Sequence, residues 1–214
     1  TNEGLVKAIN EGKSPLNERE LVPFLAKAIK AKKFNASGKI VPADIFIVCV
    51  PTPFFKETAP PKPDLSFLYE AIDQITSVLK NGDTILIEST SPVGTTKKIL
   101  EHIKNRKPTV KEFYLAYCPE RVLPGNTFQE LINNDRVVGG VDLASTNKAM
   151  EVYRAFVLGG VSGTKAEVAE MCKLVENSFR DVNIAFANEV SMICDQTGID
   201  PLEVTELANK HPRV

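Results

Sequence analysis

The stretch that decides the fold is Asp44–Val50, DIFIVCV, which is followed further along the chain by Asp83–Glu88, DTILIE. Both are short, nearly continuous apolar runs, the pattern of strands that are covered on both faces of a sheet. Two weaker runs of the same kind follow at Glu112–Tyr117 and Arg136–Val141. We therefore expect four buried strands.

Helical patterns separate these runs. Asp64 can cap a helix over residues 65–79 that Asn81-Gly82 would end, and two more helices are expected over 95–103 and 143–156. This alternation predicts an α/β fold with a parallel, doubly wound, Rossmann-like sheet. The sheet is expected to be partial, because the chain opens on a helical pattern and contains no G-x-G-x-x-G phosphate loop.

A long segment, Thr164–Gly198, has no internal Pro or Gly and predicts one long helix. With about 100° per residue, its polar side chains fall on one side: Glu170, Lys173, Asn177, Arg180, Asp181, Asn188, Ser191 and Asp195. Its apolar side chains fall on the other: Val168, Met171, Val175, Phe179, Val182, Phe186 and Ile193. A solvated face is the ordinary explanation of such a polar stripe. Lys173, Asn177 and Arg180 stand on successive turns, however, and can converge on one ligand.

Turn-forming residues divide the chain. The segment Gly159–Gly163 precedes the long helix, and we place a domain boundary there. Residues 1–161 would form the incomplete sheet domain, and residues 162–214 would begin a helical region that includes a short helix over 201–209. Segment Pro51–Pro63 carries five prolines and is expected to be an extended loop.

Composition narrows the class of protein. The 214 residues are 43% hydrophobic and 25% charged, with a formal net charge of -1, as in ordinary globular proteins. No basic block indicates a nucleic-acid partner, and no apolar run is long enough to cross a bilayer. The four cysteines, Cys49, Cys118, Cys172 and Cys194, lack metal-ligand spacing. We expect buried free thiols, no metal and a cytoplasmic location.

Three turn motifs follow the first three predicted strands, at the sheet edge where ligands of parallel sheets bind. They are Val50–Pro53, Ser89–Gly94 and Cys118–Gly125. Ordinary turn chemistry explains each motif equally well. Three of them at one edge, together with the helix that carries Lys173, favour a functional site.

The side chains at these positions suit the oxidation of an alcohol. Lys173 can act in acid–base work or stabilise an oxyanion, with Asn177 donating to the same oxygen. Glu120 can accept a proton or orient a water, and Thr52 and Thr90 can contact a cofactor. Two arginines can bind a diphosphate through their planar guanidinium groups: Arg121 and Arg180.

Several longer motifs carry a family resemblance. VPTPF, ESTSPVGTT, AYCPERVLPGN, NDRVVGG, EMCKLVENSFRDVNIAFANE and LANKHPRV together resemble the UDP-sugar 6-dehydrogenases of the UDP-glucose/GDP-mannose dehydrogenase family, over essentially the whole chain. The resemblance implies that the C6 alcohol of a UDP-sugar is oxidised to a carboxylate, with two NAD as oxidants and one water consumed. A cysteine would capture the intermediate aldehyde, which is oxidised to a thioester and then hydrolysed. The PERVLPG motif favours UDP-N-acetyl-D-mannosamine as the substrate, with UDP-N-acetylglucosamine and UDP-glucose as alternatives.

The resemblance also implies roles for particular residues. Lys173 matches the acid–base lysine with Asn177 beside it, Thr90 and Glu120 match residues around the hydrolytic water, and Thr52 and Thr90 match NAD contacts. The implied substrate contacts are Arg121, Val122, Lys173, Asn177, Arg180, His211 and Arg213. The last two would reach a UDP-sugar in the partner subunit of a homodimer formed through the long helix. Without the resemblance, His211 and Arg213 would be ordinary surface residues.

Two parts of the family pattern are missing from the sequence. The dinucleotide fingerprint would precede Thr1, and the nucleophilic cysteine would follow Val214. We therefore expect an internal fragment that is inactive alone. Two alternative functions stay open. The first is a hydroxyacid dehydrogenase of the 6-phosphogluconate or 3-hydroxyisobutyrate type, although such enzymes lack the VPTP and CPERVLPG turns. The second is a non-catalytic module for dimerisation and UDP-sugar binding.

Overall fold

The computed structural model describes residues 2–15, 21–122 and 125–212. The chain forms two compact units, Thr1–Lys173 and Leu174–Val214, which divide within one long helix. Among the described residues, no helix combines the length and the apolar character that a membrane span requires.

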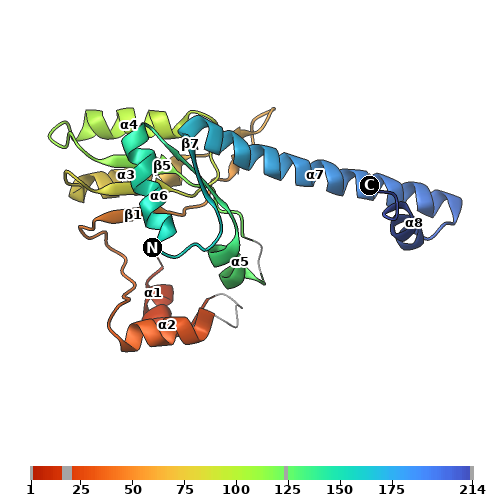
Figure 1. Cartoon of the computed structure of the whole chain (residues 1–214), viewed down its shortest axis with the longest axis horizontal. Coiled ribbons are helices and arrows are strands. Elements are labelled where there is room, and N and C mark those ends of the chain that lie inside the picture. Colours follow the sequence, from red (N-terminus) through yellow and green to blue (C-terminus); the bar gives the residue numbers. More distant parts are fainter. Residues whose placement is uncertain (1, 16–20, 123–124, 213–214) are drawn as a thin grey trace. The chain divides into compact units, whose positions relative to one another are not determined.

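The first unit is an α/β domain (Figure 1). Its strands are β1 (Ile45–Val48), β2 (Phe54–Phe55), β3 (Lys62–Pro63), β4 (Thr84–Ile87), β5 (Tyr114–Tyr117), β6 (Arg136–Gly140) and β7 (Val161–Lys165). Its helices are α1 (Glu3–Asn10), α2 (Leu21–Lys30), α3 (Ser66–Val78), α4 (Thr95–Arg106), α5 (Thr127–Asn133), α6 (Leu143–Arg154) and the start of α7 (Ala166–Thr197). The four predicted strands and the predicted helices that became α3, α4 and α6 are thus confirmed.

The main sheet has the strand order β1-β4-β5-β6-β7. Strands β1, β4 and β5 are parallel, as predicted, but β6 pairs antiparallel with β5, and β7 pairs parallel with β6. The α/β, Rossmann-like class with a mainly parallel sheet is confirmed, and the β5–β6 pair is the main sheet's one antiparallel pairing among the described strands. The described connection between β5 and β6 carries only the seven-residue helix α5.

Strand β7 was missed by the sequence analysis, which interpreted Gly159–Gly163 as a turn. Val161–Lys165 instead pairs with β6 along the whole length of that strand. Gly163 lies at the centre of β7, where a Cβ atom would meet Sδ of Met150 on α6 at 2.7 Å. The glycine that resembled a turn signal therefore permits close packing of α6 on the sheet.

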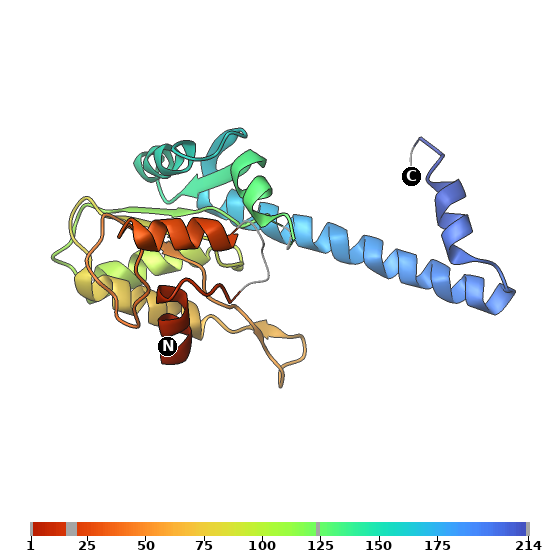
Figure 2. The ribbon, with the colours of Figure 1, turned by 90° about the horizontal axis from the view of Figure 1, so that it is seen from below.

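Alternate side chains of the strands pack on opposite faces of the sheet. Ile85 and Ile87 of β4 belong to a core beneath α3 and α4, and Leu86 belongs to a second core beneath α6. Figure 2 shows α3 and α6 on opposite sides of the strands. Both faces of the central strands are therefore covered, as their apolar sequences predicted.

Strand β1 departs from that expectation. Phe46 and Val48 are buried, but Ile45 is 42% and Ile47 is 50% exposed. Helix α6 contacts β4, β5, β6 and β7, and β1 lies at the edge of the sheet beyond them. The prediction that β1 is covered on both faces is wrong for the described residues, because no described helix reaches its second face.

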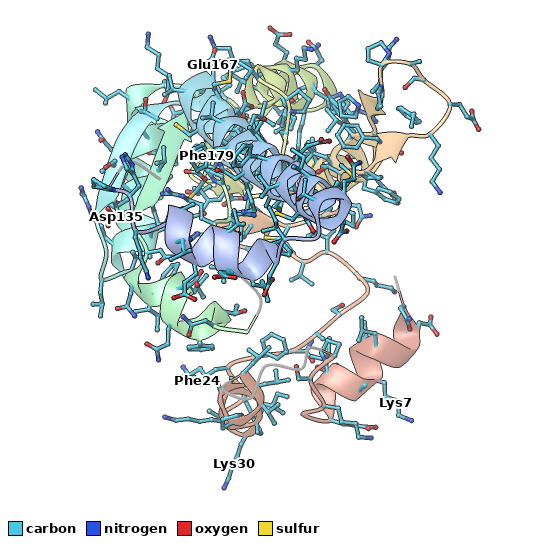
Figure 3. All side chains as sticks on the ribbon, turned by 90° about the vertical axis from the view of Figure 1, so that its right-hand side faces the viewer. Lys7, Phe24, Lys30, Asp135, Glu167 and Phe179 are labelled. Atoms are coloured by element: carbon cyan, nitrogen blue, oxygen red, sulfur yellow. The ribbon has the colours of Figure 1, made fainter. Side chains whose placement is uncertain are left out.

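The first two helices contact later parts of the first unit. The side chain of Asn10 donates to the backbone oxygen of Ala36 and accepts from its backbone nitrogen, which ties the end of α1 to the chain that leads into β1. Phe24 and Lys30 point to opposite sides of α2 (Figure 3). The ring of Phe24 stacks on Phe128 of α5, with ring centroids 4.3 Å apart. The chain thus begins with helices, as predicted.

The second unit contains the rest of α7 and helix α8 (Pro201–Ala208), which confirms the predicted long and short helices. Gly198 ends α7 with a φ of 70°, and Asp200 caps α8 by accepting from the backbone nitrogen of Leu202 at 2.9 Å. The predicted apolar stripe of α7 is solvent-exposed within this unit: Val175, Phe179, Val182, Phe186 and Ile193 are each at least 57% exposed.

Candidate active site

The carboxyl ends of β1, β4 and β5 meet at one edge of the sheet, because these strands are parallel. The hydroxyl of Ser89, just after β4, accepts from the backbone nitrogen of Val50, just after β1, at 2.8 Å. The first two predicted turn motifs are therefore bonded to each other. Thr52 and Thr90, which these motifs carry, are both half-buried.

Glu120 follows β5, and its own loop holds its carboxylate. Oε1 accepts from the backbone nitrogens of Arg121 and Val122 at 2.7 Å and 2.8 Å. Oε2 accepts from Nη1 of Arg136 at 3.3 Å. These three donors keep the carboxylate in one orientation. The side chain is still 37% exposed, so it reaches both the protein interior and solvent.

Arg136, the first residue of β6, is the largest fully buried side chain, at 1% exposure. Its guanidinium lies 5.8 Å from the ring centroid of Tyr153, and Nη2 donates to the backbone oxygen of Leu131 at 3.4 Å. Its Nε has no hydrogen-bond partner among the described residues. Burial opposes its charge, but the surrounding acidic groups, Glu120 first among them, together outweigh burial and raise the pKa of Arg136 above its usual value. The sequence analysis missed Arg136, because an Arg at the start of a strand is ordinarily exposed.

Lys173 lies at the same edge as Glu120. Its Nζ donates to the backbone oxygen of Glu120 at 2.5 Å, so the predicted acid–base lysine is anchored to the loop that follows β5. The side chain is half-buried, and two full turns of α7 precede it. The structure thus brings two residues that are far apart in the sequence into direct contact.

Glu170, one turn before Lys173, is fully buried. Its carboxylate accepts from the backbone nitrogens of Gly94 and Thr96 and from the hydroxyl of Thr96, at 2.6, 2.8 and 2.6 Å. Helical spacing correctly placed Glu170 on the face of Lys173. It did not show that this face turns into the protein at the start of the helix.

Two cysteines lie beside the same edge. Burial and the adjacent Glu88 carboxylate raise the pKa of the Cys49 thiol to about 12, although part of the residue reaches solvent. Burial raises the pKa of the Cys118 thiol, also to about 12. Both thiols are protonated near neutral pH and are poor nucleophiles. The prediction of four buried thiols holds for Cys118 and Cys194 but is wrong for Cys49, which is exposed on the uncovered side of the edge strand, and for Cys172, which is half-buried.

The remaining predicted residues are spread over the structure. Nη1 of Arg121 donates to the backbone oxygen of Asp135 at 3.0 Å, which draws its side chain toward the start of β6. Asn177, Arg180 and His211 belong to the second unit, so their convergence with Lys173 stays a prediction. Arg213 lies outside the described residues.

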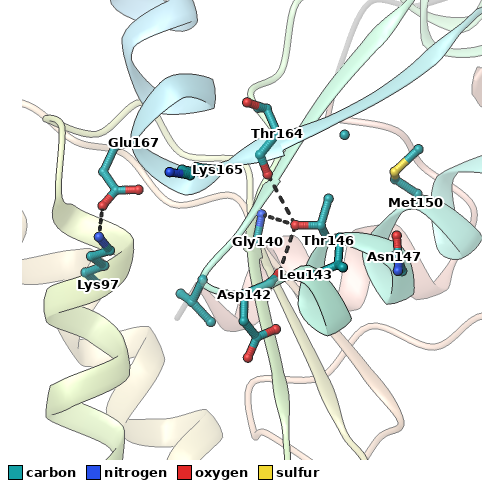
Figure 4. Close-up of a pocket in the computed structure, with 12 residues that line it drawn as sticks. Lys97, Gly140, Asp142, Leu143, Thr146, Asn147, Met150, Thr164, Lys165 and Glu167 are labelled. Carbon is teal, nitrogen blue, oxygen red and sulfur yellow. Dashed lines mark hydrogen bonds and ion pairs between the residues drawn. The ribbon is translucent and has the colours of Figure 1, made fainter.

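A separate pocket of about 680 Å³ lies beside the carboxyl ends of β6 and β7 (Figure 4). At its centre, Oγ1 of Thr146 accepts from the backbone nitrogen of Gly140 at 3.0 Å and lies 3.2 Å from the backbone oxygen of Thr164. Lys97 and Glu167 form an ion pair at its rim. None of the predicted site residues lines this pocket, and its central polar groups are bonded to each other.

The helix termini of the sheet domain bear on cofactor binding. A dinucleotide pyrophosphate binds at a helix N-terminus that follows a glycine-rich turn. The first turns of α3, α4 and α6 each already hold a carboxylate, from Asp64, Glu170 and Asp142 respectively. A carboxylate repels phosphate, so these three helices offer no pyrophosphate site. The hydroxyls of Thr52 and Thr90 at the strand ends fit contacts with other parts of a dinucleotide. Among the described residues, no group of three or more His, Cys, Asp or Glu is arranged to hold a metal ion.

Comparison with known proteins defines the family. Residues 1–157 match the NAD binding domain of the UDP-glucose/GDP-mannose dehydrogenase family, and residues 167–214 match its central domain. The chain belongs to this family, and the cofactor of the family's nucleotide-binding domain is NAD. The resemblance stated from the sequence motifs is therefore confirmed.

Individual relatives are similar over the whole chain. UDP-N-acetyl-D-mannosamine dehydrogenase of Methanocaldococcus jannaschii is 46% identical over 213 residues, which cover 100% of this chain and 49% of that protein. NDP-N-acetyl-D-galactosaminuronic acid dehydrogenase of Ralstonia nicotianae is 42% identical, with coverage of 100% and 52%. The structure of UDP-D-ManNAc dehydrogenase from Pyrococcus horikoshii has a TM-score of 0.94 at 40% identity, with coverage of 100% and 51%. The chain spans about half the length of the curated relatives it matches.

Proposed function

We propose that this chain is the part of an NAD-dependent UDP-sugar 6-dehydrogenase that carries its acid–base lysine. The observation that carries the proposal is the contact between Nζ of Lys173 and the backbone oxygen of Glu120, at the edge where β1, β4 and β5 end. In open parallel sheets, ligands bind beyond this edge. An ammonium held there, beside a carboxylate, suits proton transfer at a sugar hydroxyl.

The substrate that we propose is UDP-N-acetyl-D-mannosamine. Relatives of 46% and 42% identity are named for UDP-N-acetyl-D-mannosamine and for an N-acetyl-D-galactosaminuronic acid, which supports an N-acetylated sugar. Arg121, Val122, Asn177, Arg180, His211 and Arg213 are the proposed substrate contacts beside Lys173. UDP-N-acetylglucosamine and UDP-glucose are the alternatives.

The reaction that we propose converts the C6 alcohol to a carboxylate, with one water consumed and two hydrides removed. NAD, when bound, accepts the hydrides. Lys173 takes up and returns the proton of the sugar oxygen, and Asn177 donates a hydrogen bond to the same oxygen. Glu120 and Thr90 hold the hydrolytic water. The thioester step of the proposal needs a reactive thiol, and the raised pKa values of Cys49 and Cys118 make both poor candidates.

A second candidate function rests on the exposed apolar stripe of α7. We propose that the chain pairs with a second copy through this helix, since symmetric dimers are the commonest oligomers. A non-catalytic module for dimerisation and UDP-sugar binding would need the stripe but not Lys173.

Calorimetric titration of the 214-residue chain with each of the three UDP-sugars tests the proposal. We expect UDP-N-acetyl-D-mannosamine to bind, and Lys173→Ala to weaken binding while Lys148→Ala, which changes an exposed lysine on α6, has no effect. If none of the three UDP-sugars binds, the proposed substrate class is refuted. We expect no NADH formation by this chain alone, because it contains no glycine-rich phosphate loop. NADH formation would contradict that expectation.

A further inference from the structure

Glu170 is a buried carboxylate that no proposed reaction step uses. Its side chain accepts three hydrogen bonds, from Gly94 and twice from Thr96, and it is fully buried. An ionised group in the protein interior is tolerated only when its hydrogen bonds are satisfied. The position of this carboxylate is therefore tightly specified by these three donors.

The donors to Glu170 are Gly94, which ends the turn that carries Thr90, and Thr96, in the first turn of α4. Gly94 has a φ of 89°, and helix α4 starts directly after it without a side-chain cap of its own. Glu170 supplies that cap from another helix, and its negative charge is favoured at a helix N-terminus. The start of α7 is thus bonded to the end of the β4–α4 turn.

Lys173 provides a second anchor one turn later. Residues three apart on a helix lie on the same face, so Glu170 and Lys173 point to the same side of α7. Glu170 contacts the turn after β4, and Lys173 contacts the loop after β5 at the backbone oxygen of Glu120. A single turn of α7 therefore joins two of the three strand-end loops.

We propose that Glu170 is a positioning residue for the reaction: it fixes the first turns of α7 against the β4–α4 turn and thereby sets the position of the Lys173 amine relative to Thr90. The proposal rests on the proposed function, in which these two residues act on one substrate. Glu170 itself touches no reacting atom. Productive geometry of this kind depends on such supporting contacts.

The test is Glu170→Gln, which keeps the size of the side chain but puts an amide where one carboxylate oxygen accepted a hydrogen bond. Hydrogen exchange at the amides of Gly94 and Thr96 reports whether this contact is lost. Competitive acetylation, read by mass spectrometry across a range of pH, gives the maximal labelling rate of Lys173. This rate reports how freely its amine leaves Glu120.

We expect the maximal labelling rate of Lys173 to rise about tenfold in Glu170→Gln, the usual scale for losing a hydrogen bond to a charged group. The matched control is Glu167→Gln, which removes an equal charge one turn earlier, where the carboxylate pairs with Lys97 at the surface. The control should label Lys173 at the wild-type rate. A folded Glu170→Gln protein with fast exchange at Gly94 and wild-type labelling of Lys173 would overturn the proposal.

Thr96→Val gives an independent measurement. It removes one hydroxyl donor from Glu170 and keeps the charge and nearly the same volume. We expect a smaller rise in Lys173 labelling, and if Glu170→Gln does not fold, an unchanged rate in Thr96→Val rejects the proposal. These measurements need no substrate. A chain that binds no UDP-sugar would refute the proposed function while leaving the labelling result readable.

Discussion

Arg136, the first residue of β6, pairs with Glu120 in the loop after β5, with Nη1 of the arginine 3.3 Å from Oε2 of the glutamate. The arginine is 1% and the glutamate 37% exposed, so the pair joins a buried cation to a carboxylate that reaches solvent. Burying a guanidinium is costly, and Glu120 is the carboxylate that offsets this cost.

We predict that Glu120→Ala destabilises the first unit by about 1–3 kcal/mol, because it leaves the buried charge of Arg136 without its anion. The loss should stay below that of a fully buried pair, since water can partly replace Glu120. Urea unfolding followed by circular dichroism measures the change. Glu151→Ala, which breaks an exposed pair with Lys148, is the control and should cost under about 0.5 kcal/mol. Equal losses in the two variants would contradict the prediction.

Stability should fall at alkaline pH. The folded state raises the pKa of the Cys49 and Cys118 thiols from 9.0 to about 12, and burial raises the pKa of Tyr153 well above its usual value. Below about pH 9 these groups are protonated in both the folded and the unfolded states, and their contribution is fully present. As the pH rises toward about 12, the unfolded state loses protons that the folded state keeps, so the free energy of unfolding decreases.

Urea titrations at about pH 7 and about pH 10 measure this decrease. Cys118→Ala should show a shallower dependence on pH, even though the cavity it creates lowers stability at neutral pH. A free energy of unfolding that stays constant or rises over this interval would refute the prediction.

Two glycine substitutions should differ in cost. A Cβ atom at Gly140 would overlap the backbone nitrogen of Thr146 and the backbone oxygen of Asp142, so Gly140→Ala should cost about 3 kcal/mol. Gly82 has a φ of 90° and open space around it, so Gly82→Ala should cost only about 1–2 kcal/mol of backbone strain. Thermal unfolding of the two variants checks the order, and a larger loss for Gly82→Ala would show that the packing argument is wrong.

The proposed dimer makes its own prediction. Phe179 is 72% exposed on α7, and Phe179→Glu should weaken self-association by about tenfold or more, because a charge replaces a large apolar contact. Leu158→Glu is the control, since this 81% exposed side chain lies in the first unit. Sedimentation equilibrium gives both dissociation constants. A wild-type chain that is monomeric at every concentration would count against the dimer.

The sequence predicted the fold where side-chain periodicity is strong. The apolar run around Ile85 predicted a strand clearly, and the Gly- and Pro-free segment after Thr164 predicted one long helix. Strand direction was not predictable, because a pattern of side chains is the same for either direction of a neighbour. Strand β7 was missed since Val161–Lys165 contains a glycine that local rules assign to a turn.

The residues proposed to act in the candidate site were predictable from the sequence, but the buried residues that hold them in place were not. Lys173 and Glu120 were both selected from the sequence, and the structure brings them into contact. Glu170 and Arg136 support this contact from the interior, where charged residues are rare. No local pattern distinguishes a buried charge from an exposed one, because its partners come from distant parts of the chain.

The reversal of β6 has a practical consequence for mapping mutations onto this protein. An antiparallel strand begins at the edge of the sheet where its neighbour ends. The first residue of β6, Arg136, therefore lies beside Glu120, which follows the end of β5. Substitutions at the start of β6 therefore belong with those of the candidate active site. Gly140, only four residues later, instead lines the separate pocket, so substitutions there belong with that pocket.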